Sequence, residues 1–277
     1  METGKNSLPI DSFSNQLASK CHLGLNIYSK RLCVGISDLS AKKHIYFNEF
    51  KINSWKNDFE PFFEYEFGNS KFNKVTACLL ETPNLLVPNG LYADDLKADL
   101  FQFSKGLQKK GSLKSEKVRG LDSVNIYNEK NEIQIALSKT VKNFKIKHCQ
   151  SILLELLGRE TKSSEEIRAY VQIEETFFDL FIFNASKLVL VNRYTYKTPE
   201  DFIYFLLNSF EVFKFDIAKL PLFLMGKIEQ NDPLHSLITK YCNEVLFMDD
   251  SGAYKYSKGF TDSMHSNYLL FNQVLCV

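Results

Sequence analysis

The sequence predicts an α/β protein whose two halves have the same architecture. Three strand-like runs fall within residues 22–52, and three more fall within residues 167–196. Each set of three is followed by an amphipathic helix and then by a single apolar strand. The halves share this order of elements and little residue identity, so the repeat is one of architecture.

The first half begins with strands expected at Leu23–Tyr28, Leu32–Ser37 and His44–Ile52, separated by short polar turns. Aromatic residues at helical spacing predict a helix over Trp55–Phe67, which Pro61 should shorten. The later elements of this half are expected at Val75–Leu80 (strand), Gly90–Phe103 (helix), Val124–Tyr127 (strand), Ser138–Phe144 (short helix) and Ser151–Leu157 (apolar helix).

The second half repeats the pattern, with strands expected at Ile167–Ile173, Phe177–Phe183 and Lys187–Tyr196. The helix that follows should be capped by Thr198, with Pro199 in the first helical position and Asp201 completing a capping box. The remaining elements are expected at Leu220–Met225 (strand), Asp232–Cys242 (helix), Val245–Met248 (strand) and Tyr268–Cys276 (apolar run).

The chain is expected to divide into a flexible polar arm over 1–20, a first lobe over 21–160 and a second lobe over 161–277. One segment of the first lobe, 104–120, holds six basic residues and the single acid Glu116. We expect a solvated, flexible loop there. The alternative is a contact with an anionic partner, although the segment lacks the interleaved aromatic residues that stack on single-stranded nucleic acid.

The composition bears on the class of partner and on location. With 34 Lys and Arg against 33 Asp and Glu, the net charge of +1 gives no field to attract nucleic acid or anionic lipid. The start lacks the apolar run of a signal peptide, and no stretch reaches the roughly 18 apolar residues of a membrane span. The six cysteines occur singly, as reduced core thiols do. A cytoplasmic protein is therefore expected.

A strand meander followed by a helix and by a strand that pairs in parallel is how a ribonuclease-H-like sheet begins. Two such β-β-β-α-β units in one chain describe the superfamily of actin, Hsp70 and the sugar kinases. The predicted fold class is therefore α/β with mixed sheets, built from duplicated ribonuclease-H-like units in the actin-like ATPase fold.

Short motifs at four places carry a more specific resemblance. They are Leu86-Val87-Pro88 with Leu91-Tyr92, Ile146-Lys147-His148 leading into Leu153-Leu154-Glu155, Tyr196-Lys197-Thr198 with Glu200-Asp201-Phe202 and Tyr204, and Leu269-Leu270-Phe271-Asn272. Together they resemble a Bacteroidetes family of unknown function with an actin-like ATPase fold, over nearly all of residues 22–276. The resemblance implies the fold and carries no activity with it.

The resemblance to the superfamily allows its phosphate-binding loops to be tested. In nucleotide-binding members, the first hairpin of each lobe carries an Asp-x-Gly pattern. The carboxylate helps to hold Mg²⁺ through water, and the glycine lets backbone N–H groups approach a phosphate. Here the pattern falls on Asn26 and Tyr28 in the first hairpin and on Gln172 and Glu174 in the second. Both loops are therefore degenerate, since an amide replaces each acid and a larger side chain replaces each glycine.

Two further positions are candidate remnants of a nucleotide site. Gly226 is the one glycine left of a pair that would receive the adenosine, or it simply ends a strand. Glu81 ends the fourth strand, where it is either a catalytic acid or a solvated turn residue, and alone it cannot hold a metal. The sequence assigns no catalytic residue and no metal ligand, because the known hydrolase, metalloprotease and Walker patterns are absent.

These observations favour a non-catalytic binding or scaffold protein with an unknown protein partner, or a homodimer formed through exposed aromatic surface. ATP and Mg²⁺ are not expected as cofactors. One alternative is a diverged nucleotide-binding ATPase or phosphotransferase that draws on Asp179, Glu174, Glu175 and Glu81. The other is a polyanion binder that uses the Lys-rich segment.

Overall fold

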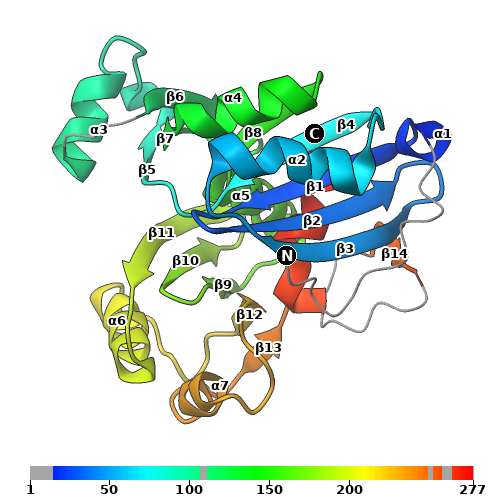
Figure 1. Ribbon diagram of the computed structural model, residues 1–277. Coiled ribbons are helices and arrows are strands. Elements are labelled where there is room, and N and C mark those ends of the chain that lie inside the picture. Colours follow the sequence, from blue (N-terminus) through cyan, green and yellow to red (C-terminus); the bar gives the residue numbers. More distant parts are fainter. Residues whose placement is uncertain (1–14, 107–110, 249–251, 258–263, 277) are drawn as a thin grey trace. The chain divides into compact units, whose positions relative to one another are not determined.

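The computed structural model describes residues 15–106, 111–248, 252–257 and 264–276, which fall into two compact units (Figure 1). Unit 1 comprises the described residues within 1–155, 253–261 and 270–277, and unit 2 comprises those within 156–252 and 262–269. Of the arm expected over 1–20, residues 1–14 lie outside the described part, and α1 (Asn15–Ala18) precedes the first strand. Within the described residues, no helix has the length and apolar character to cross a membrane.

The main sheet of unit 1 has six strands in the order β14-β3-β2-β1-β4-β8. Strand β1 pairs antiparallel with β2 and parallel with β4, and β4 pairs parallel with β8. The strands are β1 (Cys21–Ile27), β2 (Arg31–Asp38), β3 (Lys43–Lys51), β4 (Lys74–Leu79), β8 (Phe144–His148) and β14 (Lys255–Tyr256). The first four confirm the predicted meander and its crossover strand.

Two helices, α2 (Trp55–Phe67) and α4 (Asn131–Thr140), lie side by side over one face of this sheet (Figure 1). Their aromatic and aliphatic side chains share one core with the inward residues of β1, β2 and β4. The expectation that Pro61 shortens α2 is wrong, because the helix continues through it to Phe67. Proline has no N–H to donate to the carbonyl of Asn57, four residues earlier. Both residues are exposed, so water can solvate that carbonyl, and the buried aromatic face of α2 stabilises the helix.

A small second sheet in unit 1 lies between β4 and β8 in the sequence, and only its strand over 124–127 was predicted. Its order is β5-β7-β6, from β5 (Asn84–Pro88), β7 (Ser123–Glu129) and β6 (Ser112–Lys117). The turn η2 (Asn89–Leu91) and helix α3 (Lys97–Lys105) connect β5 to the rest, so the helix predicted from Gly90 begins later.

The prediction of a flexible loop over 104–120 is wrong for 112–117, which form β6, while residues 107–110 lie outside the described part. Strand β6 is an edge strand of polar residues, a composition that gives no sequence signal. It is anchored by Glu116, whose carboxylate accepts the His148 N–H at 2.9 Å. The bounds of the short helix predicted over 138–144 are also wrong, because α4 ends at Thr140 after starting at Asn131, and β8 begins at Phe144.

The sheet of unit 2 has five strands in the order β11-β10-β9-β12-β13. They are β9 (Ile167–Ile173), β10 (Phe177–Asn184), β11 (Lys187–Thr195), β12 (Leu222–Gly226) and β13 (Val245–Phe247). This order, with its parallel and antiparallel pairs, matches β3-β2-β1-β4-β8 of unit 1. The predicted duplication of a ribonuclease-H-like unit is confirmed.

The crossover helix of unit 2 is α6 (Pro199–Val212), and its predicted capping box is confirmed. The Thr198 hydroxyl accepts the Asp201 N–H at 3.2 Å, and the Asp201 carboxylate accepts the Thr198 N–H at 3.3 Å. Two N–H groups that helix geometry leaves without partners are thereby satisfied. The other helices of this region are α5 (Cys149–Glu160), which begins in unit 1, η3 (Thr161–Ser163), α7 (Pro233–Ile238) and η4 (Met264–Asn267).

The C-terminal segment returns to the sheet of unit 1. Helix α8 (Tyr268–Asn272) and turn η5 (Gln273–Cys276) end the described chain, and residues 270–276 belong to unit 1. Two glycines explain how the segment reaches the sheet. A Cβ on Gly24 of β1 would lie 2.8 Å from Gln273 Nε2, and one on Gly35 of β2 would lie 3.0 Å from Leu270 Cγ. The absent side chains leave room that no hydrophobic pattern reveals.

We predict that two buried histidines of the unit 1 sheet make the fold sensitive to acid. Burial, with the charges of Lys74 and His44, lowers the pKa of His22 to about 3, and burial lowers that of His44 to about 4, from an ordinary value of 6.5. Between these values and pH 6.5 the unfolded chain binds protons that the folded chain does not. Each histidine should therefore reduce the free energy of unfolding by about 1.4 kcal/mol per pH unit as the pH falls below 6.5.

Urea titrations at several pH values measure this slope. The variant His22→Gln should flatten it, because it removes one of the two buried imidazoles. Equal slopes for the native protein and His22→Gln would contradict the assignment.

Candidate functional site

Each unit has its own candidate site, which is the hairpin turn after β1 in unit 1 and the hairpin turn after β9 in unit 2. Nucleotide-binding members of the superfamily would hold phosphate at such turns. Parallel pairing sets each turn beside the end of a fourth strand, with Ile27 opposite Leu79 and Ile173 opposite Gly226. The pairing continues one residue further in both units, since the Leu80 N–H donates to Ile27 O at 3.1 Å and the Lys227 N–H donates to Ile173 O at 2.7 Å. The two turns are therefore equivalent in backbone geometry.

In unit 1, a carboxylate of the chain occupies the turn. The Ser29 N–H donates to Glu81 Oε2 at 2.7 Å, across the interval between the β1–β2 turn and the end of β4. A backbone N–H at this turn is the kind of donor that a phosphate oxygen would accept from. Glu81 is exposed, and its carboxylate bonds the turn itself.

Tyr28 fills the place where a glycine would let a phosphate approach. Its side chain is 7% exposed, and the guanidinium of Arg31 lies 3.8 Å from the centre of its ring. Arg31 also pairs with Glu49 at 3.6 Å, and the Trp55 indole N–H donates to Tyr28 O at 3.1 Å. The turn is therefore packed by its own neighbours on several sides.

Asn26, which stands where the metal-holding acid would be, is buried in β1. Its Oδ1 accepts a hydrogen bond from Gln273 Nε2 at 3.3 Å. Gln273 lies 247 residues further along the chain, so the sequence gives no signal for this contact. An amide pair at this position neutralises no cation charge and leaves the Gln273 Oε1 atom buried without a hydrogen-bond partner.

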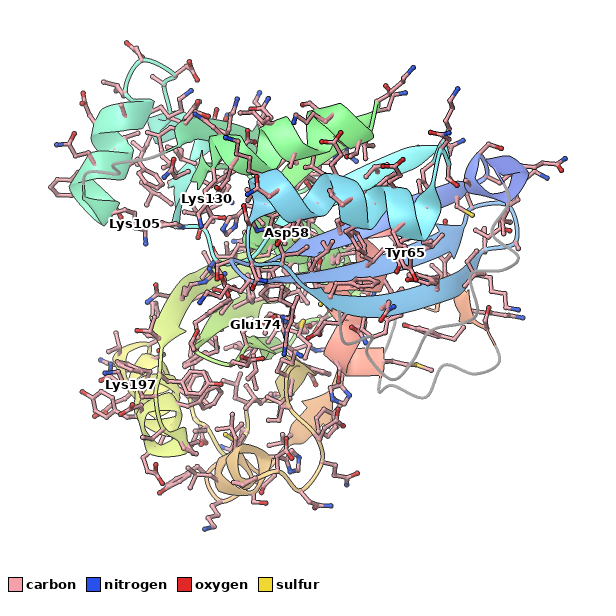
Figure 2. The ribbon with its side chains drawn as sticks, viewed as in Figure 1. Asp58, Tyr65, Lys105, Lys130, Glu174 and Lys197 are labelled. Carbon is pink, nitrogen blue, oxygen red and sulfur yellow. The ribbon has the colours of Figure 1, made fainter. Side chains whose placement is uncertain are left out.

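In unit 2, the equivalent amide and the residue in the glycine position contact each other. Gln172 Nε2 donates to Glu174 Oε1 at 3.2 Å, and both side chains are buried. Glu174 directly follows the last residue of β9 (Figure 2), and its backbone carbonyl accepts a hydrogen bond from the Tyr196 hydroxyl at 2.6 Å. Burial, with the charges of Glu174 and Glu175, raises the pKa of Tyr196. A buried carboxylate thus lies where a phosphate would be seated.

Gly226 has a packing reason to be glycine. Its φ of +90° lies in the left-handed region, and a Cβ there would lie 2.2 Å from Ile173 O and 2.6 Å from Gln172 Nε2. Gln172 and Glu174 were predicted as two positions of one degenerate loop and Gly226 as a separate remnant, and the structure brings all three together at the end of β9. The close approach of β12 to β9 accounts for this glycine without a ligand.

Asp179 forms an ion pair that the sequence analysis missed. On β10 it lies opposite Gln172, and Arg193 of β11 lies opposite Asp179. Arg193 donates to both carboxylate oxygens, at 2.8 and 2.6 Å, and its guanidinium also lies 4.0 Å from the centre of the Phe177 ring. A single acid in the buried run Phe-Phe-Asp-Leu-Phe-Ile-Phe was the available signal, because a buried charge requires a partner.

The residues at these turns do not fit a bound Mg²⁺–nucleotide. Asn26 and Gln172 offer amides where carboxylates would hold the hydrated ion, Tyr28 and Glu174 fill the glycine positions, and Glu81 already accepts the turn N–H. Glu175, the last acid of the candidate pool, is exposed. In the part of the chain that the structure describes, no three His, Cys, Asp or Glu side chains come together as a metal site.

Two solved structures define the class of protein. A Bacteroides thetaiotaomicron protein with an actin-like ATPase fold and unknown function matches with a TM-score of 0.78 and 14% identity, over 93% of this chain and 98% of that chain. The PilM-PilN type IV pilus biogenesis complex matches with a TM-score of 0.62 and 10% identity, over 92% of this chain and 98% of that chain. The protein therefore has the actin-like ATPase fold, as predicted.

The family is more specific than the fold. Residues 10–245 match the family described as "Protein of unknown function (DUF3822)", and the chain belongs to this family. No curated protein sequence gives a significant match. The resemblance to a family of unknown function with an actin-like fold is confirmed.

We predict that the Asp179–Arg193 pair serves stability. Arg193→Ala should lower the free energy of unfolding by about 3–5 kcal/mol, because it leaves a carboxylate that is 0% exposed without its cation. Replacing both partners, with Asp179→Leu and Arg193→Met, should recover most of this loss. Urea denaturation of Arg193→Ala and of the double variant measures both effects.

The control is Lys219→Ala, which removes an exposed pair with Asp216 and should change stability by less than about 0.5 kcal/mol. A loss for Arg193→Ala as small as that of the control would rule out the stabilising role.

Proposed function

We propose that this protein is a non-catalytic member of the actin-like fold that works by binding a protein partner. The observation that supports it most is the occupation of both hairpin turns by carboxylates of the chain, Glu81 at Ser29 in unit 1 and Glu174 beside Gln172 in unit 2. The same functional position has thus been closed by different residues in each unit. A single chance replacement would not produce this outcome twice.

Electrostatic repulsion by these carboxylates opposes the binding of a nucleotide phosphate at the turns. A carboxylate about 4 Å from one phosphate charge is repelled by about 4 kcal/mol at the effective dielectric constant of a protein surface. Glu174 is buried, so water screens its charge poorly. The alternative of a diverged nucleotide enzyme also loses Asp179 from its pool of acids, because Arg193 holds that carboxylate at both oxygens.

Exposed aromatic side chains and a structural neighbour solved together with a second protein support partner binding. A neighbour of the same fold was solved as the PilM-PilN complex, in which it is accompanied by a second protein. Several aromatic side chains of the present chain are largely exposed, among them Tyr65, Phe103 and Tyr204. A homodimer through such side chains is the other form of this proposal. Six free and buried cysteines support a cytoplasmic location, where thiols stay reduced.

The test is a melting-temperature screen against ATP, ADP and GTP at millimolar concentration, with and without Mg²⁺. A ligand at a hundred times its Kd would stabilise the fold by about 2.7 kcal/mol, which shifts the melting temperature by several degrees. We predict shifts below about 1 °C, equal to those given by sodium chloride of the same ionic strength.

The variant Glu81→Ala, which removes the acceptor of the Ser29 N–H, goes through the same screen and checks whether Glu81 is what keeps a phosphate from this turn. A shift of several degrees with Mg²⁺–ATP for the native protein would contradict the proposal, and steady ATP hydrolysis by purified protein would end it.

A further inference from the structure

Two adjoining cavities open on unit 1, at the amino ends of β4 and β8. Their volumes are about 340 Å³ and about 600 Å³, and both are lined by Lys142 and Asn143 from the segment between α4 and β8. Parallel strands β1 and β4 carry the hairpin turn and Glu81 at their carboxyl ends. The cavities therefore lie at the opposite end of the sheet from the degenerate phosphate turn, about 20 Å away at 3.3 Å per residue.

Four lysines line the two cavities: Lys71, Lys74, Lys142 and Lys145. All four are exposed, and none of them forms an ion pair with a described residue. No acidic side chain is among the described residues that line either cavity. We call this surface the lysine groove. In a chain with a net charge of only +1, it is a local concentration of positive charge.

The backbone of the lysine groove is held in place. The Gly68 N–H donates to Glu64 O at 2.9 Å and ends α2, and the Val141 N–H donates to Leu137 O at 2.8 Å and ends α4. Asn73 is bonded through its backbone N–H to Cys21 O at 3.0 Å and through its amide to Ser19 O at 3.1 Å. The groove therefore exists before any ligand binds, which lowers the entropy cost of binding.

The walls between the lysines identify the ligand class. Phe144 lines the smaller cavity and Phe72 the larger one, and both are partly exposed. No described arginine lines it, although arginine is the residue that recognises phosphate in a bidentate manner. Lysine point charges around apolar walls suit carboxylates that alternate with apolar side chains. The combined volume also exceeds what a single small anion fills.

We propose that the lysine groove binds an acidic segment of a partner protein, with apolar side chains of that segment packed against Phe144 in one cavity and Phe72 in the other. The lysines supply long-range attraction and set the orientation of the segment, and the apolar walls supply burial. The inference adds the chemistry of the partner to the proposed function and rests on it for the existence of a partner. The nucleotide screen above and the binding test below can fail separately, because they concern opposite ends of the sheet.

The test measures fluorescence anisotropy of a labelled Glu-Glu-Phe repeat peptide of about twelve residues, titrated with the full chain. We expect saturable binding at low salt that weakens as salt is added, since surface charges are screened over about 10 Å at 0.1 M. A Gln-Gln-Phe repeat of the same length should bind at least about tenfold more weakly. Inorganic triphosphate and heparin serve as competitors.

Two variants that each lose four positive charges locate the binding site. Replacing the four groove lysines, with Lys71→Gln, Lys74→Gln, Lys142→Gln and Lys145→Gln, should weaken binding at least about tenfold. The matched control replaces four exposed lysines of unit 2, with Lys162→Gln, Lys187→Gln, Lys197→Gln and Lys240→Gln, and should weaken it less than about twofold.

Three results would overturn the proposal. They are an absence of binding by the Glu-Glu-Phe peptide at low salt, an equal loss in the groove and control variants, and complete displacement of the peptide by triphosphate at equal concentration. All the substitutions are at exposed lysines, so the variants should keep the native melting temperature, which is measured first.

Discussion

Parallel pairing of the first strand with the fourth is the constraint on which the rest of this structure depends. In each unit it runs one residue past the strand ends and so fixes a hairpin turn beside the residues that follow the fourth strand. In unit 2 this close approach restricts the residue type, because only glycine at position 226 fits against Ile173. In unit 1 it allows Glu81 to accept the Ser29 N–H. The geometry that could receive a phosphate also lets the chain close the position with its own groups.

The two units show how duplicated backbones accommodate different side chains. The position on the second strand opposite the site amide is Cys33 in unit 1 and Asp179 in unit 2, and its neighbours on the third strand are Glu49 and Arg193. The Cys33 thiol donates to Glu49 at 3.5 Å, whereas Asp179 and Arg193 form a buried ion pair. Strand register keeps the pairs in place, and the chemistry within each pair is free to change as long as buried polar groups stay bonded.

Much of this fold follows from the sequence, because alternating and continuous apolar runs, turn residues and a capping box are local signals. They place strands β1–β4, β7 and β9–β13 and helices α2 and α6, including the Thr198–Asp201 cap. Strand β6 was missed because most of its residues are polar, and β5 because it is a five-residue strand that ends in proline. The pairing of both with β7 is decided by long-range contacts, such as that of Glu116 with His148. For the candidate sites, the sequence alone predicted the loss of the Asp-x-Gly pattern at both turns. The bonds that replace it were not predicted, because Glu81 and Gln273 reach the first hairpin from distant parts of the chain.

The most direct test of the closed turns is amide NMR of the labelled full chain during titration with Mg²⁺–ATP. Our account predicts that the backbone N–H signals of Ser29, Lys30, Glu175 and Thr176 do not move at millimolar nucleotide, and that the Ser29 signal shifts when Glu81 is replaced by alanine. Saturable shifts of the turn signals on addition of nucleotide to the native chain would show that the turns remain open to phosphate, and would contradict the account.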